Sequence, residues 1–304
     1  RGLYLGTHRQ GCRAEERGGL MSDGAEKTFR IGHSPDPDDA FMFYAMAKGV
    51  VKVPGWRIEH VMEDIQSLNV RAFQGDLEMT AISAHAYPKV AHKYGILHSG
   101  ASMGRNYGPI IVSKTFVHPA ESLNWLKGKR IAVPGEWTTA FLLLNLALPE
   151  YTPVQADFAA IMGMVERGEV DAGLVIHEGQ ITFRSMGLFK LLDLGHWWAD
   201  ITPLPLPLGL DVIRRDLGPE LIPVFSAAMR ASIDYAIANE DKAVPYALEF
   251  GRGIDLDTGT RFVRMYVNRD TQDLHGEGVA ALKLLYEMAV SRSLLDKVPD
   301  LTLF

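Results

Sequence analysis

The sequence predicts an α/β protein with two lobes and a ligand cleft between them. Two ungapped segments 100 residues apart, 30–41 and 130–141, each read as a short apolar strand, a proline-broken loop and an apolar helix. A second pair, 73–83 and 166–177, each reads as a helix ending at glycine, an acidic turn and a buried strand. A unit that occurs twice indicates two similar lobes, and the loops after their strands would line the cleft.

In the first part of the chain, apolar runs predict strands at 29–33, 56–62, 79–83, 97–103 and 109–113. Helices are expected at 38–47, 67–74 and 84–94. Asp38 or Asp39 would cap the first of these, and Gly75 and Gly95 would end the other two.

In the rest of the chain, strands are predicted at 130–133, 172–176 and 189–193, and helices at 122–126, 139–148, 158–167, 223–238, 241–250, 257–267 and 276–291. The proline-rich segment 201–207 is interpreted as a return linker. This order predicts a discontinuous first lobe, 29–115 plus 205–304, and an inserted second lobe, 116–204. Two crossings between lobes would form a hinge.

The composition narrows the class of protein. The 304 residues are 47% hydrophobic and 22% charged, as in a globular protein. A net charge of −6 without a basic block argues against a nucleic-acid partner. No window approaches the roughly 18 apolar residues of a membrane span, so no membrane partner is expected. The sequence does not predict the oligomeric state.

The first residues contribute little to this fold. Residues 1–20 lack an apolar run and so do not resemble a secretory signal, and 1–28 are expected to form a disordered extension. We therefore expect a cytoplasmic protein. The single cysteine, Cys12, precedes Met21, and a chain beginning at Met21 would have no thiol for a disulfide or a metal.

His177 is the first candidate for chemistry. It ends an apolar strand, where α/β sheets place their ligands. An imidazole, whose unperturbed pKa is about 6.5, is a natural general base. Glu178 would point to the opposite face of the strand and is not an obvious partner. A structural histidine at a strand edge is the alternative, but His177 follows the counterpart of Ser83 in the internal match, which favours a role in the site.

Asp36, Asp38 and Asp39 form an acidic cluster after the first strand. They could bind magnesium, as paired aspartates do in phosphotransferases. Helix capping is the favoured interpretation, because no second acidic cluster of matching type follows. Histidine spacing typical of a metal site is also missing, and no cofactor motif is present, so we expect neither a metal nor a cofactor.

Three further residues could bind a ligand. Thr138 and Thr139 open a helix, where hydroxyls and backbone N–H groups suit a carboxylate or a hydroxyl. Arg105, in a glycine-rich loop, could pair with an anionic ligand, although such an arginine is more often solvated. Trp197 and Trp198 are adjacent, so one could lie in the core and the other line the cleft.

Together these motifs resemble the 1,4-dihydroxy-6-naphthoate synthase family of the futalosine route to menaquinone. The resemblance runs from about Phe29 to the C-terminus, and its N-terminal signature is Ser-Pro-Asp-Pro-Asp-Asp-Ala-Phe-Met-Phe-Tyr-Ala at 34–45. It includes Val-Pro-Gly at 133–135, Gly-Leu-Val-Ile-His-Glu at 173–178 and Leu-Pro-Leu-Pro-Leu-Gly at 204–209.

The resemblance implies a fold like the type II periplasmic binding proteins and a lyase that converts cyclic dehypoxanthinyl futalosine to 1,4-dihydroxy-6-naphthoate without a cofactor. It implies that His177 is the proton acceptor. The expected substrate contacts, from the resemblance and from the residues together, are Ala81, Ile82, Ser83, Thr138, Thr139, Ala140, Arg105 and Asp39.

The chain departs from the family pattern at four positions. The family usually has Cys and Asn at the positions of Asp36 and Asp38, often has Lys at that of Ala81, and commonly has Gly at that of Pro203. Added acids and a lost lysine would weaken the binding of an anionic substrate. A divergent member with an altered substrate is therefore an open alternative. Two others are a solute-binding protein of the same fold, against which the missing secretory signal counts, and the sister enzyme chorismate dehydratase, over which the His177 segment favours the synthase.

Overall fold

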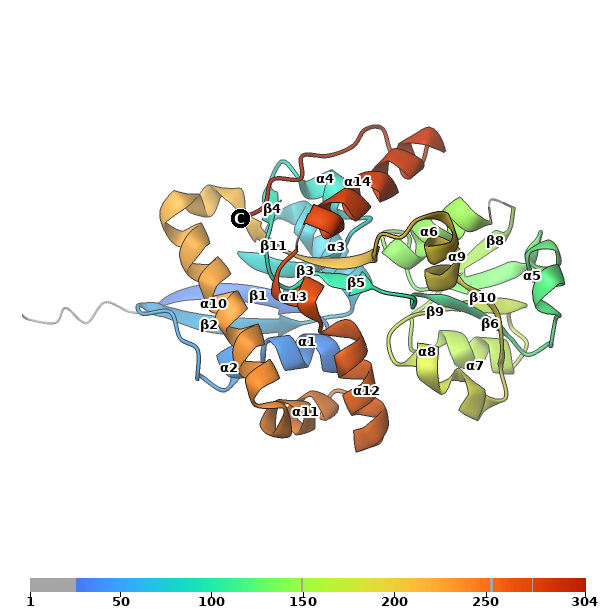
Figure 1. Ribbon diagram of the computed structural model, residues 1–304, viewed down its shortest axis with the longest axis horizontal. Coiled ribbons are helices and arrows are strands. Elements are labelled where there is room, and N and C mark those ends of the chain that lie inside the picture. Colours follow the sequence, from blue (N-terminus) through green and yellow to red (C-terminus); the bar gives the residue numbers. More distant parts are fainter. Residues whose placement is uncertain (1–25, 149, 252–253, 275) are drawn as a thin grey trace, which may run out of the picture.

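The computed structural model describes residues 26–148, 150–251, 254–274 and 276–304 (Figure 1). Nearly all of the predicted disordered extension, with Cys12 and Met21, lies outside the described residues. Figure 1 shows two groups of strands and helices side by side, joined by extended segments.

The first lobe is built on a six-stranded sheet. Its strands are β1 (Lys27–His33), β2 (Trp56–Met62), β3 (Met79–Ser83), β4 (Tyr94–Ile96), β5 (Ser102–Gly104) and β11 (Leu206–Arg214). The order is β2-β1-β3-β11-β4, and β5 also pairs with β11. β1 runs parallel to β2 and β3, whereas β11 is antiparallel to its neighbours.

The second lobe is built on a five-stranded sheet. Its strands are β6 (Ile110–Ser113), β7 (Arg130–Val133), β8 (Thr152–Gln155), β9 (Ala172–Val175) and β10 (Phe189–Asp193). The order is β10-β6-β9-β7-β8. β7 runs parallel to β8 and β9, and β6 is antiparallel to β9 and β10.

The two sheets repeat one topology. In each, a parallel trio has the first strand of the unit at its centre, β2-β1-β3 in one lobe and β8-β7-β9 in the other. An antiparallel fourth strand, β11 or β6, follows the third. The predicted two-lobed α/β fold is therefore confirmed. The loops that follow β1 and β7 emerge at the carboxyl edges of the two parallel trios, where ligands bind in such folds.

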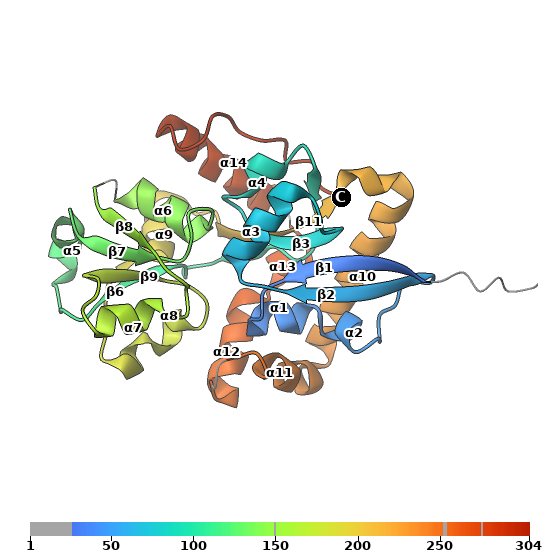
Figure 2. The same ribbon diagram turned by 180° about the vertical axis from the view of Figure 1, so that it is seen from behind.

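Helices cover both sheets (Figure 2). Those of the first lobe are α1 (Pro37–Met42), α2 (Tyr44–Ala47), α3 (Ile65–Gln74), α4 (Tyr87–Val90), the 3₁₀ turn η2 (Arg215–Leu217), α10 (Gly218–Ala238), α11 (Glu240–Leu248), α12 (Leu256–Tyr266), α13 (Arg269–Gln272) and α14 (Gly276–Ser291). Those of the second lobe are α5 (Pro119–Leu126), α6 (Thr139–Ala147), α7 (Ile161–Glu166), α8 (Gly179–Thr182), the 3₁₀ turn η1 (Phe183–Met186) and α9 (Leu194–Ile201).

The longest helix, α10, packs against the first sheet. Phe225 of this helix stacks on Phe29 of β1 with ring centroids 3.4 Å apart, and the Ser232 hydroxyl donates to the Met42 carbonyl. Among the described residues, the segment Arg215–Ala238 is long and apolar enough to cross a membrane by length and composition alone. Its buried face is part of the lobe's hydrophobic core.

Several local predictions are wrong. Most of the strand expected at 97–103 is the connection between β4 and β5. The helix expected at 84–94 is only the short α4, and Gly95 lies within β4, where an added Cβ would overlap the Phe304 ring. The first helix is interrupted at Phe43, which separates α1 from α2. The expected linker at 201–207 ends inside β11, which tolerates Pro207 because the register with β5 shifts there.

The lobe boundaries stay a proposal. β6 pairs within the second sheet, which would move the first crossing to before Ile110 instead of residue 116. The sequence signal near Pro119 marks the first turn of α5.

Candidate active site

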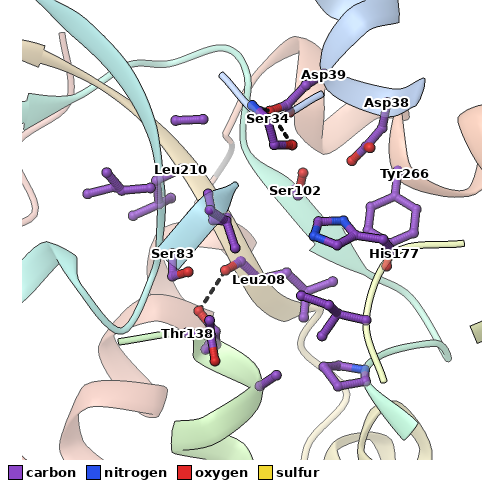
Figure 3. Close-up of a pocket in the computed structure, with 18 of the residues that line it drawn as sticks. Ser34, Asp38, Asp39, Ser83, Ser102, Thr138, His177, Leu208, Leu210 and Tyr266 are labelled. Carbon is purple, nitrogen blue, oxygen red and sulfur yellow. Dashed lines mark hydrogen bonds between the residues drawn. The ribbon is translucent and has the colours of Figure 1, made fainter. Parts of the chain in front are cut away.

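A cavity with about 650 Å³ of empty space, open solvent included, lies where the two lobes meet (Figure 3). Its wall comes mainly from β3 and β11, from the segments that follow β1, β7 and β9, and from α12. The structure brings together these predicted site residues on the wall: Asp39, Ala81, Ile82, Ser83, Thr138, Thr139, Ala140 and His177. Their individual roles remain predictions.

The acidic cluster after β1 is organised around Ser34. The Ser34 backbone N–H donates to Asp39 Oδ2 at 2.6 Å, and its hydroxyl lies 2.7 Å from Asp36 Oδ2 and 2.9 Å from Asp39 Oδ2. The N-cap residue of α1 is Asp36, and its side chain makes no capping hydrogen bond. The prediction that Asp38 or Asp39 caps this helix is therefore wrong, and the carboxylates turn into the loop and the cavity instead.

Burial changes the acidity of this cluster. Burial, followed by the charge of Asp39, raises the pKa of Asp38 well above its ordinary value, and Asp38 Oδ1 is buried without a hydrogen-bond partner. Burial also raises the pKa of Asp39 to about 6, against the hydrogen bonds from Ser34. A carboxyl with a raised pKa keeps its proton to a higher pH than an exposed carboxyl, and in the protonated form it can donate a hydrogen bond to a ligand.

His177 stands opposite this cluster, at the end of β9. Its backbone is left-handed, with φ of 53°, which is uncommon for a residue other than glycine and is often found at functional sites. Its Nδ1 lies 3.1 Å from Asp36 Oδ2. Its Nε2 is buried and has no hydrogen-bond partner in the protein. The ring, held edge-on by Phe158, therefore offers one nitrogen to the cavity.

The N-terminus of α6 forms another side of the cavity. Thr138 is its N-cap, and its hydroxyl accepts from the Phe141 N–H at 3.2 Å. The Thr139 hydroxyl donates to the Leu208 carbonyl of β11 at 2.6 Å. The first turn of a helix has N–H groups without intrahelical partners, so a carboxylate is favoured here.

Ser83 is fixed by Asn69 of α3. The Asn69 amide group donates to Ser83 Oγ at 3.0 Å, and its carbonyl accepts from the Ser83 N–H at 2.8 Å. The next turn contains His85, whose Nδ1 lies 3.3 Å from the Thr138 carbonyl. Burial lowers the pKa of His85 to about 4, so this ring is neutral.

Arg105 is outside the residues that line the cavity. Its Nε and Nη2 donate to Asp270 at 2.7 and 2.9 Å, and Nη2 also lies 3.0 Å from Glu277. These contacts give no support to Arg105 as a substrate contact. The two tryptophans also lie away from the cavity wall, with Trp198 fully buried and bonded to the Leu204 carbonyl and Trp197 packed against the core.

Several wall residues were missed at the sequence level. They come from elements that the internal repeat does not include: Ser102, Gln180, Leu208, Leu210 and Tyr266. The amide of Gln180, in the second lobe, donates to the Tyr266 hydroxyl of the first lobe. Only the fold brings these segments together. Across the described ranges, no group of three or more His, Cys, Asp or Glu side chains could hold a metal ion.

Comparison with known proteins identifies the family. The family model described as "Menaquinone biosynthesis" matches residues 29–291. The chain belongs to this menaquinone biosynthesis family. Membership confirms the resemblance predicted from the motifs.

Two curated members of the family are similar over nearly the whole chain. The 1,4-dihydroxy-6-naphthoate synthase of Thermus thermophilus is 39% identical over 273 residues, 90% of this chain and 98% of the relative. The synthase of Streptomyces coelicolor is 35% identical over 285 residues, 91% of this chain and 98% of the relative.

Solved structures extend the comparison. A protein of Archaeoglobus fulgidus is 51% identical, with a TM-score of 0.84, covering 88% of this chain and 98% of that protein. The alkanesulfonate-binding protein of Xanthomonas axonopodis pv. citri, solved with MOPS, has a TM-score of 0.71 but only 14% identity, over 91% of this chain and 98% of that chain. At that identity the likeness shows the fold alone, which is that of the periplasmic binding proteins.

Proposed function

We propose that this protein is a 1,4-dihydroxy-6-naphthoate synthase of the cytoplasm, a carbon–carbon lyase that converts cyclic dehypoxanthinyl futalosine to 1,4-dihydroxy-6-naphthoate. Two relatives with that name, each matched over 98% of its length, support the proposal. A cavity lined by both lobes is consistent with it, because small-molecule sites commonly lie between lobes or domains.

The observation that carries the proposal is the state of His177. Its Nε2 is buried without a protein partner and the ring lines the cavity, whereas Nδ1 contacts Asp36. A nitrogen with a free lone pair at the wall of a cavity suits a general base. In the proposed reaction it accepts a proton from the sugar-derived part of the substrate, and aromatisation of the new ring favours cleavage.

The surrounding groups would hold and orient the substrate. The N-terminus of α6, with Thr138 and Thr139, is the proposed place for the substrate carboxylate. The carboxyls of Asp38 and Asp39, whose pKa values are raised by burial, can donate hydrogen bonds to substrate oxygens while they are protonated.

The decisive experiment supplies purified protein with cyclic dehypoxanthinyl futalosine and follows formation of the naphthoate. We expect turnover by the wild type. We expect His177→Gln, which keeps a hydrogen-bonding side chain without the basicity, to lose roughly 10²–10⁴-fold in kcat, as does His177→Ala. Substrate binding by both variants, measured by calorimetry, should stay near the wild-type level.

Other outcomes would contradict parts of the proposal. Binding of the substrate without turnover by the wild type would identify a solute-binding protein on the same fold. Turnover of chorismate instead would identify the sister enzyme. Near-normal kcat for His177→Gln would show that the residue only packs or orients.

A further inference from the structure

We propose that Asp36 is a positioning residue that holds His177 in the tautomer required of a base, and that this pair is assembled only when the two lobes close. The inference rests on the proposed function for its kinetic consequences. Its structural claim, a hydrogen on Nδ1 directed at Asp36, stands independently of the substrate.

The geometry begins with the two lobes. Asp36 follows β1 in the first lobe, whereas His177 follows β9 in the second. Asp36 Oδ2 and His177 Nδ1 are 3.1 Å apart, within hydrogen-bond distance. Because the two residues belong to different sheets, any opening of the cleft separates them.

The carboxylate is held from behind. The Ser34 hydroxyl lies 2.7 Å from the same Asp36 oxygen that faces His177, and Asp36 is fully buried. A buried carboxylate fixed in this way has little freedom to turn from the imidazole. It therefore selects the ring orientation as well as the tautomer.

The consequence for His177 follows from imidazole chemistry. A carboxylate only accepts hydrogen bonds, so Nδ1 must carry the hydrogen, and in the neutral ring Nε2 then has the lone pair. This is the nitrogen that lies buried without a partner at the cavity. When Nε2 takes a proton from the substrate, the imidazolium charge forms beside the Asp36 carboxylate, which stabilises it.

Other titratable groups surround the His177 ring, and the test must distinguish their effects from that of Asp36. Asp38 and Asp39 come from α1, Tyr266 from α12, and Glu178 is next in sequence. Asp39 is the matched control, because it shares the Ser34 hydroxyl with Asp36 and interacts with His177 only through its charge.

The test combines imidazole ¹H–¹⁵N NMR with kinetics on Asp36→Asn and Asp39→Asn, the His177 signals being assigned by their loss in His177→Gln. In the wild type we expect a hydrogen on Nδ1 with a strongly downfield proton signal. Asp36→Asn should lose that signal, whereas Asp39→Asn should keep it. With Asp36→Asn we also expect kcat to fall by roughly 10²–10⁴-fold with little change in KM, and the ascending limb of the pH profile to move to lower pH.

A hydrogen on Nε2 in the wild type would overturn the inference, and so would an unchanged NMR signal in Asp36→Asn. If Asp36→Asn does not fold, Asp36→Glu is measured in its place, and a retained signal with partial kcat is expected. A wild type that fails to turn over the substrate defeats the proposed function alone, because the NMR result still decides whether the pair exists.

Discussion

At the scale of single residues, Arg105 shows how a charged side chain near a cleft can have a purely structural partner. Its guanidinium makes two hydrogen bonds to Asp270, whose side chain is only 1% exposed. These bonds raise the pKa of Arg105 further above its ordinary value. We therefore expect the main role of Arg105 to be structural.

We therefore expect Arg105→Ala to reduce the free energy of unfolding by about 1–3 kcal/mol, because it leaves Asp270 buried without its cation, while the exposure of Arg105 limits the loss. Urea unfolding measures this. Arg130→Ala is the control, since its pair with Asp171 is longer and more exposed and should cost less. A tenfold rise in KM with unchanged stability would restore Arg105 to the binding site.

Asp211 is a second residue-scale case. It lies on β11 opposite Ala81, it is 1% exposed, and neither carboxylate oxygen has a hydrogen-bond partner. Burial, followed by the charge of Asp39, raises its pKa well above the ordinary value. The folded protein therefore keeps this proton to a higher pH than the unfolded chain does.

The sign of the pH dependence follows from this raised pKa. The stability linked to Asp211 is fully present below the unfolded pKa of about 3.9 and is lost as pH rises toward the folded pKa, by at most about 1.4 kcal/mol per pH unit. The asparagine of Asp211→Asn does not ionise, so this variant does not lose stability in this way. Its free energy of unfolding, measured with urea, should therefore increase relative to that of the wild type between pH 5 and pH 8. Asp257→Asn, on an exposed side chain, should run parallel to the wild type. Parallel curves for Asp211→Asn would show that Asp211 ionises normally.

At the scale of elements, close backbone contacts join α9 to the loop before β6. A Cβ added at Gly195 would lie 2.1 Å from the Tyr107 carbonyl carbon and 2.4 Å from the Gly108 nitrogen, which are backbone atoms that cannot rotate away. We expect Gly195→Ala to destabilise the protein by roughly 1–3 kcal/mol or more in thermal unfolding. Gly276→Ala in α14, where the added Cβ meets nothing within 4 Å, should be neutral or slightly stabilising. Equal melting temperatures for the two variants would refute this reading of the contact.

The helices and strands also show which features could be predicted from the sequence. The two repeated units were predictable because strand, loop and helix follow one another locally, and they place Ser83, Thr138, Thr139 and His177 at the cavity. Caps and stops such as Thr138 and Gly75 also depend only on neighbouring residues.

What could not be predicted depends on pairing between distant segments. β11 reads as a proline-rich linker because its partners, β3, β4 and β5, lie more than 100 residues earlier. Asp36 and His177 are 141 positions apart and lie in different lobes, so no local sequence pattern predicts their contact. The ion pair of Arg105 could not be predicted for the same reason, since Asp270 is 165 residues away.

At the scale of the whole molecule, polar contacts hold the lobes together across the cleft. The Trp137 N–H, in the loop after β7, donates to Gln66 Oε1 at 3.0 Å, and the Asn69 amide donates to the Trp137 carbonyl at 3.3 Å. The Asp36–His177 contact is a third link. The cavity wall is formed by both lobes, so a ligand that fills it gains contacts with both only in this closed arrangement.

We therefore expect bound product to favour the closed arrangement. We expect a substrate to enter this cavity when the lobes separate, and a ligand then shifts the balance by its higher affinity for the closed state. Small-angle X-ray scattering should show a smaller radius of gyration with saturating 1,4-dihydroxy-6-naphthoate. Gln66→Ala, which removes one link between the lobes, should bind the product more weakly and require more of it for the same change. Identical scattering with and without bound product would show that the lobes do not move as a hinge, and that ligand reaches His177 by a smaller local opening of the wall.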